Sequence, residues 1–575
     1  MSHETPSTQR TQHAFLVAWG WFAQETNLIQ KIEGINLKQK TYHHSPQSKV
    51  LEFLVGTLAG LQHLQELSSA AHPIDHDIAV ATAWEQPDWA DYSGVSRTLS
   101  RLTWEEVRAI AQVLEEVSQP YLQTEIKLLR SQGKRLRMDG DLTGLPVSNT
   151  SQTYPNVAFG HMDDEIRLGY QAGVVSMESP SYGRIWLSVA HHSGDTISCT
   201  QAEALVLEAE RRTGQRPRRR VEQLRERMIQ FELHLKQVQT RLETQQTVVR
   251  QTKEEWDRTG LETQECHTQL DELVQYYQAR QREERPTSHL AQARKRHQSL
   301  LLRLQRREKA HHSAQQRLNK TQTQLQIEQI QFLDLQKRLS RFEQENTLNP
   351  EPVEAEFRLD AGFGTYENVA LLIEMGYEVY TKPYGQHVTD QLKQKVDDQT
   401  AYTRVGANAE MIAWPNYKLS HCPYPLDTAL ERFYTGSTLK HSTLFHYGVD
   451  PVTQDLPAWF NQYNSRQIIE AGIKEGKQVF FLHKLKVRSE PAIFLQECFV
   501  LFAANFIRWG MHWLAKQAQP VKNALDIRKL GIKRQVQVAA HVSAQVIRNS
   551  EGRLLKFSRH SAFAGKVLLL PMNQP

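Results

Sequence analysis

The sequence contains little of what secreted or disulfide-stabilised proteins use. Its only cysteines are far apart and form no Cys-x-x-Cys pair: Cys199, Cys266, Cys422 and Cys498. This spacing argues against a zinc ribbon and against a disulfide framework, and it fits a reducing compartment. The N-terminal segment MSHETPSTQRTQ is polar, so we expect no secretory signal.

No long hydrophobic run is free of polar residues. The most apolar stretch, residues 492–514, includes charged and polar side chains: Gln496, Glu497, Asn505, Arg508 and His512. We expect such a helix to be buried in protein rather than in lipid, and we predict no membrane association.

The chain has 575 residues, of which 39% are hydrophobic and 23% are charged, as is typical of globular domains. At about 150 residues per domain, this length predicts three or four domains. Lys and Arg number 69, and Asp and Glu number 64, which gives a net charge of +5. This small excess permits a polyanionic partner but does not require one.

Residues 1–130 are predicted to be helical, with a capping box at Thr103-x-x-Glu106. Residues 93–100 combine short polar side chains with Arg97. They are interpreted either as an ordinary loop between helices or as residues that face DNA, as in helix-turn-helix modules. We therefore predict that 1–130 is a helical domain, which contacts DNA on the second interpretation.

The next regions have strand patterns. Residues 131–204 alternate apolar residues with Gly, Pro, Asn and Asp, which predicts a meander. Residues 349–520 combine strands and helices: strands at 356–360 and 378–381 flank a helix at 366–375, and 462–514 is helical. Residues 521–575 have strand signals at 535–542, 546–548, 554–558 and 567–570, with a hairpin turn at 549–552.

Between these regions, residues 205–348 are nearly free of Gly and Pro and are rich in Gln, Arg, Glu, Lys and Leu. Every seventh residue from Val221 is apolar in eight of nine cases, and every seventh from Leu224 in five of nine. This pattern predicts a coiled coil. Arg285-Pro286 would end the first helix, so we predict an antiparallel hairpin insertion. The hairpin either packs only on itself or dimerises.

The first acidic motif is Arg137-Met-Asp-Gly-Asp-Leu-Thr-Gly144. Asp139 and Asp141 are two residues apart on a predicted strand, so their side chains share one face. The pair is interpreted either as a metal site or as local turn chemistry.

The second acidic motif is Phe357-Arg-Leu-Asp-Ala-Gly-Phe363, in which Asp360 closes a predicted strand. Sites in open α/β sheets form at the carboxyl ends of strands. Asp360 is therefore either a site residue or a cap for the following helix.

The third motif is Tyr463-x2-Arg466-x3-Glu470-x6-Lys477 on one predicted helix. At about 100° per residue, the four side chains fall within an arc of about 60°. A phenol, a guanidinium, a carboxylate and an ammonium on one stripe suit a phosphodiester next to a metal. The alternative is an exposed Arg466–Glu470 pair.

Two carboxylates from strand ends and one from a later helix suit two divalent cations. Such cations, about 3.5–4 Å apart, activate a nucleophile and stabilise the leaving oxygen of an in-line displacement. Oxygen ligands favour Mg²⁺ or Mn²⁺.

Together the motifs resemble those of the DDE transposases of bacterial insertion sequences, in the insertion sequence four superfamily. The signature of that branch, Tyr-x2-Arg-x3-Glu-x6-Lys, stands here in full as Tyr463, Arg466, Glu470 and Lys477.

The family's other two motifs are also matched. An Asp two residues before a Thr is similar to Asp141-Leu-Thr143, and Asp-small-Gly-Phe is similar to Asp360-Ala-Gly-Phe363. Family members often carry an insertion between the second Asp and the Glu, whereas the long helical insertion of this chain lies mostly between the two Asp residues.

The resemblance implies an α/β fold with a ribonuclease H-like catalytic core, which is a mixed sheet flanked by helices. Residues 131–204 and 349–520 would form the core. Residues 1–130 would be an all-α N-terminal domain that binds the DNA ends, 205–348 the coiled-coil hairpin and 521–575 a β-rich segment.

The resemblance also implies roles for individual residues. Asp141, Asp360 and Glu470 would be the catalytic ligands of two Mg²⁺ or Mn²⁺ ions, with Asp139 as the alternative first carboxylate. The DNA phosphates would be bound by Tyr463, Arg466 and Lys477.

The implied function is transposition. The enzyme would bind the terminal inverted repeats of its element, hydrolyse a phosphodiester and transfer the 3′-hydroxyl strand to target DNA, and we expect a cut-and-paste route. Its partners would be double-stranded DNA and a second copy when the ends are paired, in a bacterial cytoplasm at the nucleoid. The alternatives are a ribonuclease H-like nuclease, a domesticated inactive DNA-binding derivative and a non-enzymatic coiled-coil scaffold.

Overall fold

The structure is a computed structural model that describes residues 7–162, 165–397, 399–517, 530–549, 552–557, 563 and 567–570. The chain divides into two compact units. The first contains Met1–Arg218 and Glu351–Pro575, and the second contains Arg219–Pro350. The predicted mixed α/β class is confirmed, because the first unit combines a mixed sheet with flanking helices.

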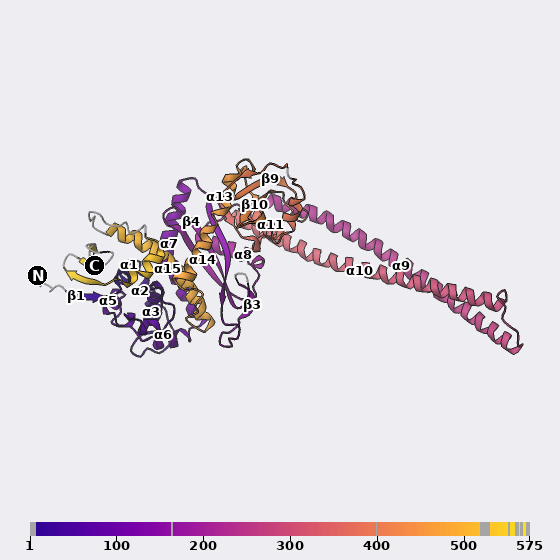
Figure 1. Ribbon diagram of the computed structural model, residues 1–575, viewed down its shortest axis with the longest axis horizontal. Helices are drawn as coiled ribbons and strands as arrows, with labels where there is room; N and C mark the ends of the chain where they lie inside the picture. The colour runs from indigo at the N-terminus through magenta and orange to yellow at the C-terminus, as the bar shows by residue number, and fades with distance from the viewer. Residues whose placement is uncertain are drawn as a thin grey trace. The chain divides into compact units, whose positions relative to one another are not determined.

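A ten-stranded sheet lies at the centre of the first unit (Figure 1). Its strands are β2 (Leu136–Pro146), β3 (Ala158–Met162), β4 (Glu165–Ser179), β5 (Gly183–Ser193), β6 (Ala355–Arg358), β7 (Glu378–Thr381), β8 (Thr403–Arg404), β9 (Ala409–Tyr417), β10 (Leu426–Thr435) and β11 (Thr438–Tyr447). The order is β3-β4-β2-β6-β7-β11-β10-β9-β8, with β5 also paired to β4.

The predicted meander is confirmed by the first strands of the sheet. β2 pairs antiparallel with β4, and β4 pairs antiparallel with β5. β6 is parallel to β2, and β7 is parallel to β6. With α11 (Tyr366–Glu374) between them, β6 and β7 form the predicted βαβ unit.

Helices cover both faces of this sheet. Alternate residues of β2 point to opposite faces, so their neighbours show which helix lies on which face. A side chain at Gly140 would meet Leu205 of α8 (Ala202–Thr213). On the other face, Thr143 shares a small cavity with Gly472 of α14 (Gln467–Val479) and with Val500 of α15 (Glu490–Gln517).

The chain between β7 and α14 extends the sheet. After α12 (His387–Lys393), strands β8 to β11 pair antiparallel and join β7 through β11. α13 (Leu456–Asn464) packs on this part through a buried cluster that includes Met411, Leu444, Trp459 and Tyr463. The sequence patterns do not predict these strands.

The first unit also contains a helical region with these bounds: α1 Ala14–Glu25, α2 Leu28–Glu33, α3 Pro46–Leu58, α4 Glu66–Ser69, α5 Ile78–Ala83, α6 Tyr92–Leu99 and α7 Trp104–Ser131. The predicted capping box at Thr103 and Glu106 is present. The prediction of a loop at 93–100 is wrong: these residues lie almost entirely in α6, because the Asp91 side chain accepts from the Gly94 amide and caps the helix.

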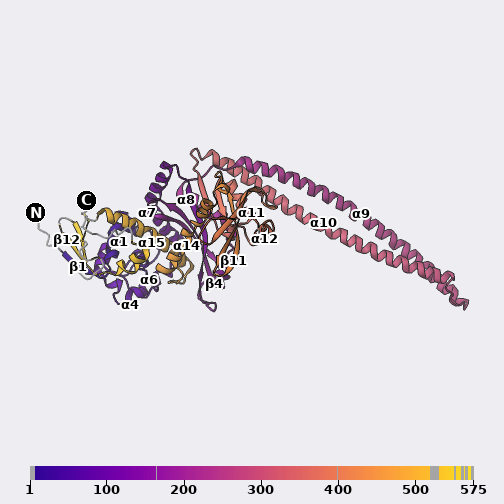
Figure 2. The ribbon, with the colours of Figure 1, turned by 45° about the horizontal axis from the view of Figure 1, so that its top comes forward.

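The prediction of an all-α N-terminal region is wrong at its start. β1 (Ser7–Thr11) pairs with β12 (Ala544–Asn549), and β13 (Gly552–Phe557) and β14 (Val567–Leu570) complete a small sheet (Figure 2). β12 and β13 pair antiparallel with Asn549 opposite Gly552, while residues 550–551 of the predicted turn lie outside the described residues. The strand predicted at 535–542 is wrong, because α16 (Ile532–Gln537) and a short 3₁₀ helix, Ala539–His541, lie there.

The apolar segment 492–514 lies in α15, which is long and apolar enough to cross a membrane. Its most apolar window is 78% buried inside the protein, as predicted for a core helix. Its polar residues have partners within the protein. For example, the Asn505 amide donates to the carbonyl of Trp186 in β5 and accepts from the amide of that residue.

The second unit is a hairpin of two 59-residue helices, α9 (Val221–Ala279) and α10 (His289–Thr347), joined near Pro286 as predicted (Figure 1). Ring pairs place Phe231 against Phe332 and His267 against His297, so the helices run antiparallel. The predicted range began at residue 205, but α8 belongs to the first unit.

The buried residues of α9 all fall on the predicted seven-residue repeat: Leu224, Leu235, Val238, Thr259, Thr263 and Cys266. In α10, the buried residues are Leu290, Thr321, Leu325, Leu335 and Phe342, and Phe332 is partly buried.

Candidate active site

The acidic motifs meet where β2 and β6 lie side by side. Asp139 is opposite Arg358 in the parallel register of these strands. Asp141 and Asp360 each lie two residues further along, so they are level with one another and on the same face of the sheet. Glu470 comes to them from α14, which covers that face.

Asp139 is committed to a buried ion pair. Its two carboxylate oxygens accept from Nε and Nη2 of Arg358, at 2.6 and 2.7 Å. Both residues are buried. Since a bidentate arginine occupies both oxygens, Asp139 has little capacity left to bind a cation. This geometry favours Asp141 as the first carboxylate of the site.

Asp141 faces the remaining acidic residues. Its side chain is 14% exposed, and one oxygen lies 3.4 Å from Nη1 of Arg466. Burial raises the pKa of this carboxyl to about 7, and the charges of Asp360 and Glu470 raise it further, whereas Arg466 opposes the shift. The carboxylates are therefore close enough to repel one another.

Asp360 caps a local turn and also lies near the other acidic residues. Its side chain accepts from the Gly362 amide at 2.9 Å and caps a 3₁₀ turn, Ala361–Phe363. Burial raises its pKa, Arg466 lowers it, and Glu470 raises it again. A local cap and a place in the acidic cluster are thus compatible.

The helix predicted to carry the third motif is interrupted. α13 ends at Asn464, and α14 begins at Gln467, so the prediction of one continuous helix is wrong. Arg358 explains the interruption: its guanidinium donates to the Gln462 carbonyl at 3.0 Å and to the Ser465 hydroxyl. The buried Asp139–Arg358 pair therefore also supports the turn that precedes Glu470.

Arg466 lies at the start of α14, between carboxylates. It is 2.5 Å from Glu470 and 3.4 Å from Asp141. Burial lowers the pKa of this guanidinium, but the surrounding anionic groups outweigh burial and raise it. Arg466 is thus a fixed cation that balances part of the acidic cluster.

Tyr463 is buried beside Arg466. Its ring belongs to the buried cluster under β9 to β11, and only 5% of the residue is exposed. Burial raises the pKa of its hydroxyl to about 12, with Arg466 beside the phenol opposing the shift. The structure therefore places Tyr463 next to Arg466 rather than on the surface.

Lys477 lies two turns further along α14 than Glu470, about 10 Å along the helix axis. Between them, Gly472 leaves room for Arg184 of β5, whose guanidinium would lie 2.2 Å from a side-chain carbon at that position. Arg184 donates to the Ile468 carbonyl and to Glu475, which holds α14 on the sheet.

Lys382 is a site residue that the sequence analysis missed. It follows β7 as Asp360 follows β6, and the carboxyl ends of these parallel strands are adjacent. Its amine lies 5.5 Å from the centre of the Tyr463 ring and 3.9 Å from Glu431. Burial lowers its pKa, and Arg466 lowers it further. The sequence did contain one signal for Lys382, namely a lysine directly after a predicted strand.

The acidic cluster has the donors that Mg²⁺ or Mn²⁺ prefers, namely carboxylate oxygens. Burial is the main cause of the raised pKa of Asp141, and the charges of Asp360 and Glu470 add to it. Each of two ions would bind only some of the carboxylate oxygens, so the three carboxylates need not all surround a single ion. By donor chemistry and charge, the residues fit such ions.

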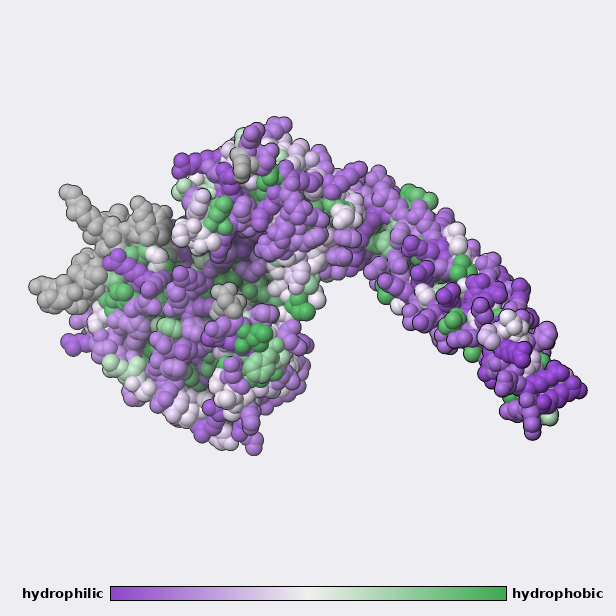
Figure 3. All heavy atoms as spheres, turned by 45° about the vertical axis from the view of Figure 1, so that its right-hand side comes forward, coloured by the Kyte–Doolittle hydropathy of each residue, from purple (hydrophilic) through white to green (hydrophobic). Residues whose placement is uncertain are grey.

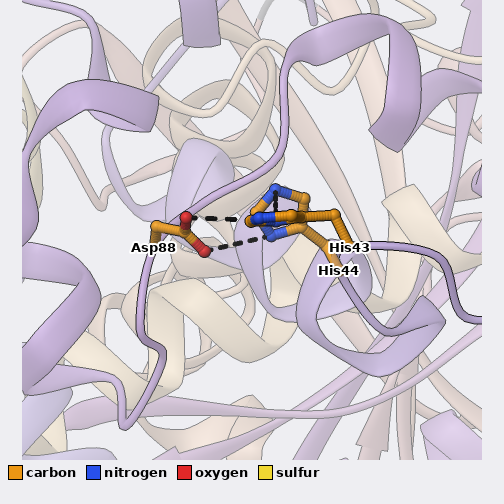
Figure 4. Close-up of side chains that lie close together, drawn as sticks. All are labelled: His43, His44 and Asp88. Atoms are coloured by element: carbon orange, nitrogen blue, oxygen red, sulfur yellow. Dashed lines mark hydrogen bonds and ion pairs between the residues drawn. The ribbon is translucent and has the colours of Figure 1, made fainter.

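A separate group combines two imidazoles and a carboxylate: His43, His44 and Asp88 (Figure 4). Nδ1 of His43 lies 3.1 Å from Nε2 of His44, and Nδ1 of His44 lies 3.3 Å from Asp88. The His43 side chain is 77% exposed. This group lies in the helical region and is not part of the acidic cluster.

No protein-family model and no curated protein matches this chain. The site is therefore interpreted from its own residues.

Proposed function

We propose that this chain is a DDE-type DNA transposase with a ribonuclease H-like core. The connectivity of the central strands supports this fold. β2, β4 and β5 form a meander, and after α8 and the hairpin insertion the chain adds β6 and β7 parallel to β2. α14 then returns over the sheet, so one strand, one strand end and one helix supply the three carboxylates.

One observation supports this proposal most strongly. Asp141, Asp360 and Glu470 come from positions 219 and 110 residues apart in sequence. Glu470 and Asp141 lie 2.5 and 3.4 Å from the guanidinium of Arg466, and the charge of Asp360 also acts on it. A purely structural use of Glu470 would need only its pair with Arg466. It would not account for the second, buried carboxyl of Asp141, which lies 3.4 Å from the same guanidinium.

The three carboxylates would hold two Mg²⁺ or Mn²⁺ ions, which activate a water or a 3′-hydroxyl and stabilise the leaving oxygen of the DNA strand. Arg466 balances carboxylate charge and orients Glu470. Tyr463, buried beside it, restricts where the guanidinium can lie. Lys382, beside Tyr463, and Lys477, two turns beyond Glu470 on α14, would hold DNA phosphates.

The proposed reaction has two stages. The enzyme cuts a phosphodiester at the end of its element and then joins the 3′-hydroxyl to target DNA. Its partners are the duplex ends, the target duplex and, when two ends are paired, a second copy of the chain. The cut-and-paste route and the recognition of terminal inverted repeats follow from the family resemblance.

Strand transfer tests this function against a simple nuclease. Labelled duplexes with a pre-cut element end would be incubated with Mg²⁺ and a supercoiled plasmid. We expect joined products with the wild-type chain and at least about a hundredfold less with Glu470→Gln. Asp390→Asn, an exposed change on α12, is the matched control. Cutting without any joining would support a nuclease instead.

A further inference from the structure

The outer face of α10 carries a row of lysines and arginines: Lys295, Arg306, Lys309, Arg317 and Lys320. At about 100° per residue, all five lie within an arc of about 80°. The arc is opposite the face that contains Leu304 and Leu318 and that packs toward α9. We call these five residues the α10 basic stripe.

The stripe is exposed and has no anionic partners. All five residues are exposed, and within the described part of the chain no side-chain hydrogen bond or ion pair involves any of them. Between residues 294 and 320 the only acidic residue is Glu308, which lies outside the arc. Figure 3 shows the hairpin surface as mostly hydrophilic.

Other arginines of α10 behave differently. Arg303 lies 3.8 Å from Glu262 of α9, and Arg307 lies 2.5 Å from Glu255 of α9. Arg294 pairs with Glu284 in the connection. The cations nearer α9 are thus neutralised within the hairpin, whereas the stripe leaves at least five positive charges uncompensated on one side.

The spacing of the stripe matches double-stranded DNA. Lys295, Arg306 and Arg317 are separated by eleven residues each, as are Lys309 and Lys320, which is about 16–17 Å along the helix. One turn of B-DNA is about 34 Å, and a straight rod along the duplex crosses two backbones per turn, or one every 17 Å on average. The stripe therefore offers a cation near successive backbone crossings.

We propose that the α10 basic stripe binds the phosphate backbone of duplex DNA without reading its sequence. An amphipathic helix for an anionic membrane needs a continuous free apolar face beside its cations. The apolar row of α10 packs against α9, and the exposed Leu302 and Ile327 are isolated on the side of the stripe. The stripe would add a second, non-catalytic contact to DNA. This inference extends the proposed function, which supplies the DNA.

The test is equilibrium binding of the full chain to a random duplex of about 30 base pairs, measured by fluorescence anisotropy over a range of salt concentrations. The stripe variant replaces all five residues with Gln. The matched control makes the same charge change on exposed positions of α9: Lys236, Arg241, Arg250, Lys253 and Arg258. A third variant, with Lys295, Lys309 and Lys320 changed to Arg, keeps the charge of the stripe.

We expect the stripe variant to bind DNA at least about tenfold more weakly than wild type. The slope of log K against log salt concentration should be smaller in magnitude by about three. The α9 control should stay within about twofold, and the Arg variant should bind like wild type. Circular dichroism checks that the helices of each variant are retained.

Equal losses in the stripe variant and the α9 control would contradict the inference, because net charge alone would then explain binding. Unchanged DNA binding with lost binding to phosphatidylserine vesicles would also contradict it and favour a membrane. Since no readout requires cleavage, a chain that never cuts DNA can still show stripe-dependent binding. Normal cleavage without a stripe effect would reject only this inference.

Discussion

Arg358 joins both oxygens of Asp139 and, through the same guanidinium, the turn between α13 and α14. This one side chain links β2, β6 and the helix that carries Glu470. It also removes Asp139 from competition with Asp141 for a cation. The buried pair is thus the structural support of the site rather than a part of its chemistry.

Asp139→Asn is expected to destabilise the protein strongly. It would leave the buried Arg358 charge without its partner, which costs about 3–5 kcal/mol in comparable buried pairs. Urea unfolding would measure the change, with the exposed Asp390→Asn as control. A loss below about 1 kcal/mol would mean that the pair does not support the site.

Asp141→Asn is expected to stabilise the protein, and more so at high pH. A folded pKa of about 7, raised above 3.8, means that wild type loses stability as the pH rises through this range. Because Asn stays neutral, the difference in free energy of unfolding between the variant and wild type should grow by roughly 2–4 kcal/mol between pH 4 and pH 8 and then level off. Thermal melts without divalent cations would measure it, and a pH-independent difference would contradict the burial of this carboxyl.

Lys382→Met is expected to lower DNA cleavage by roughly 10- to 100-fold with little change in folding, because it removes a cation beside the cluster. Lys382→Arg should recover part of the activity. Lys393→Met, on the exposed side of α12, should behave as wild type. Equal cleavage by Lys382→Met and wild type would remove Lys382 from the site.

Gly364→Ala is expected to disturb the site through the backbone. A side-chain carbon at Gly364 would lie 1.7 Å from the Lys382 carbonyl oxygen, so the loop after Asp360 would have to move away from β7. We expect a cost of about 1–3 kcal/mol. Gly531→Ala is the control, because nothing lies within 4 Å of that position. Similar melting temperatures for both variants would show that the loop adapts.

Local patterns predicted the elements that depend on local forces. The seam of α9 and the strands around Asp141 and Asp360 follow from periodicity and turn residues. These local patterns did not predict the partner of Asp139. Arg358 is 219 residues away in sequence, and only the parallel register of β2 and β6 brings it close.

The break before α14 was missed for a related reason. The spacing of Tyr463, Arg466 and Glu470 fits one helix, and nothing nearby in sequence forbids it. The interruption is instead accompanied by hydrogen bonds from Arg358 on β6 to the turn. Similarly, the alternation around Val536 suggested a strand, but Gln535 and Val536 are both buried in α16.

Metal-dependent cleavage of DNA that carries the element's own ends tests the central claim most directly. Wild type, Asp141→Asn, Asp360→Asn and Glu470→Gln would be compared in Mg²⁺ and in Mn²⁺, after each is shown to bind the DNA. The account predicts nicking by wild type that requires the metal and falls at least about a thousandfold in all three variants. Tight binding without cleavage by wild type, or cleavage that survives all three substitutions, would contradict it.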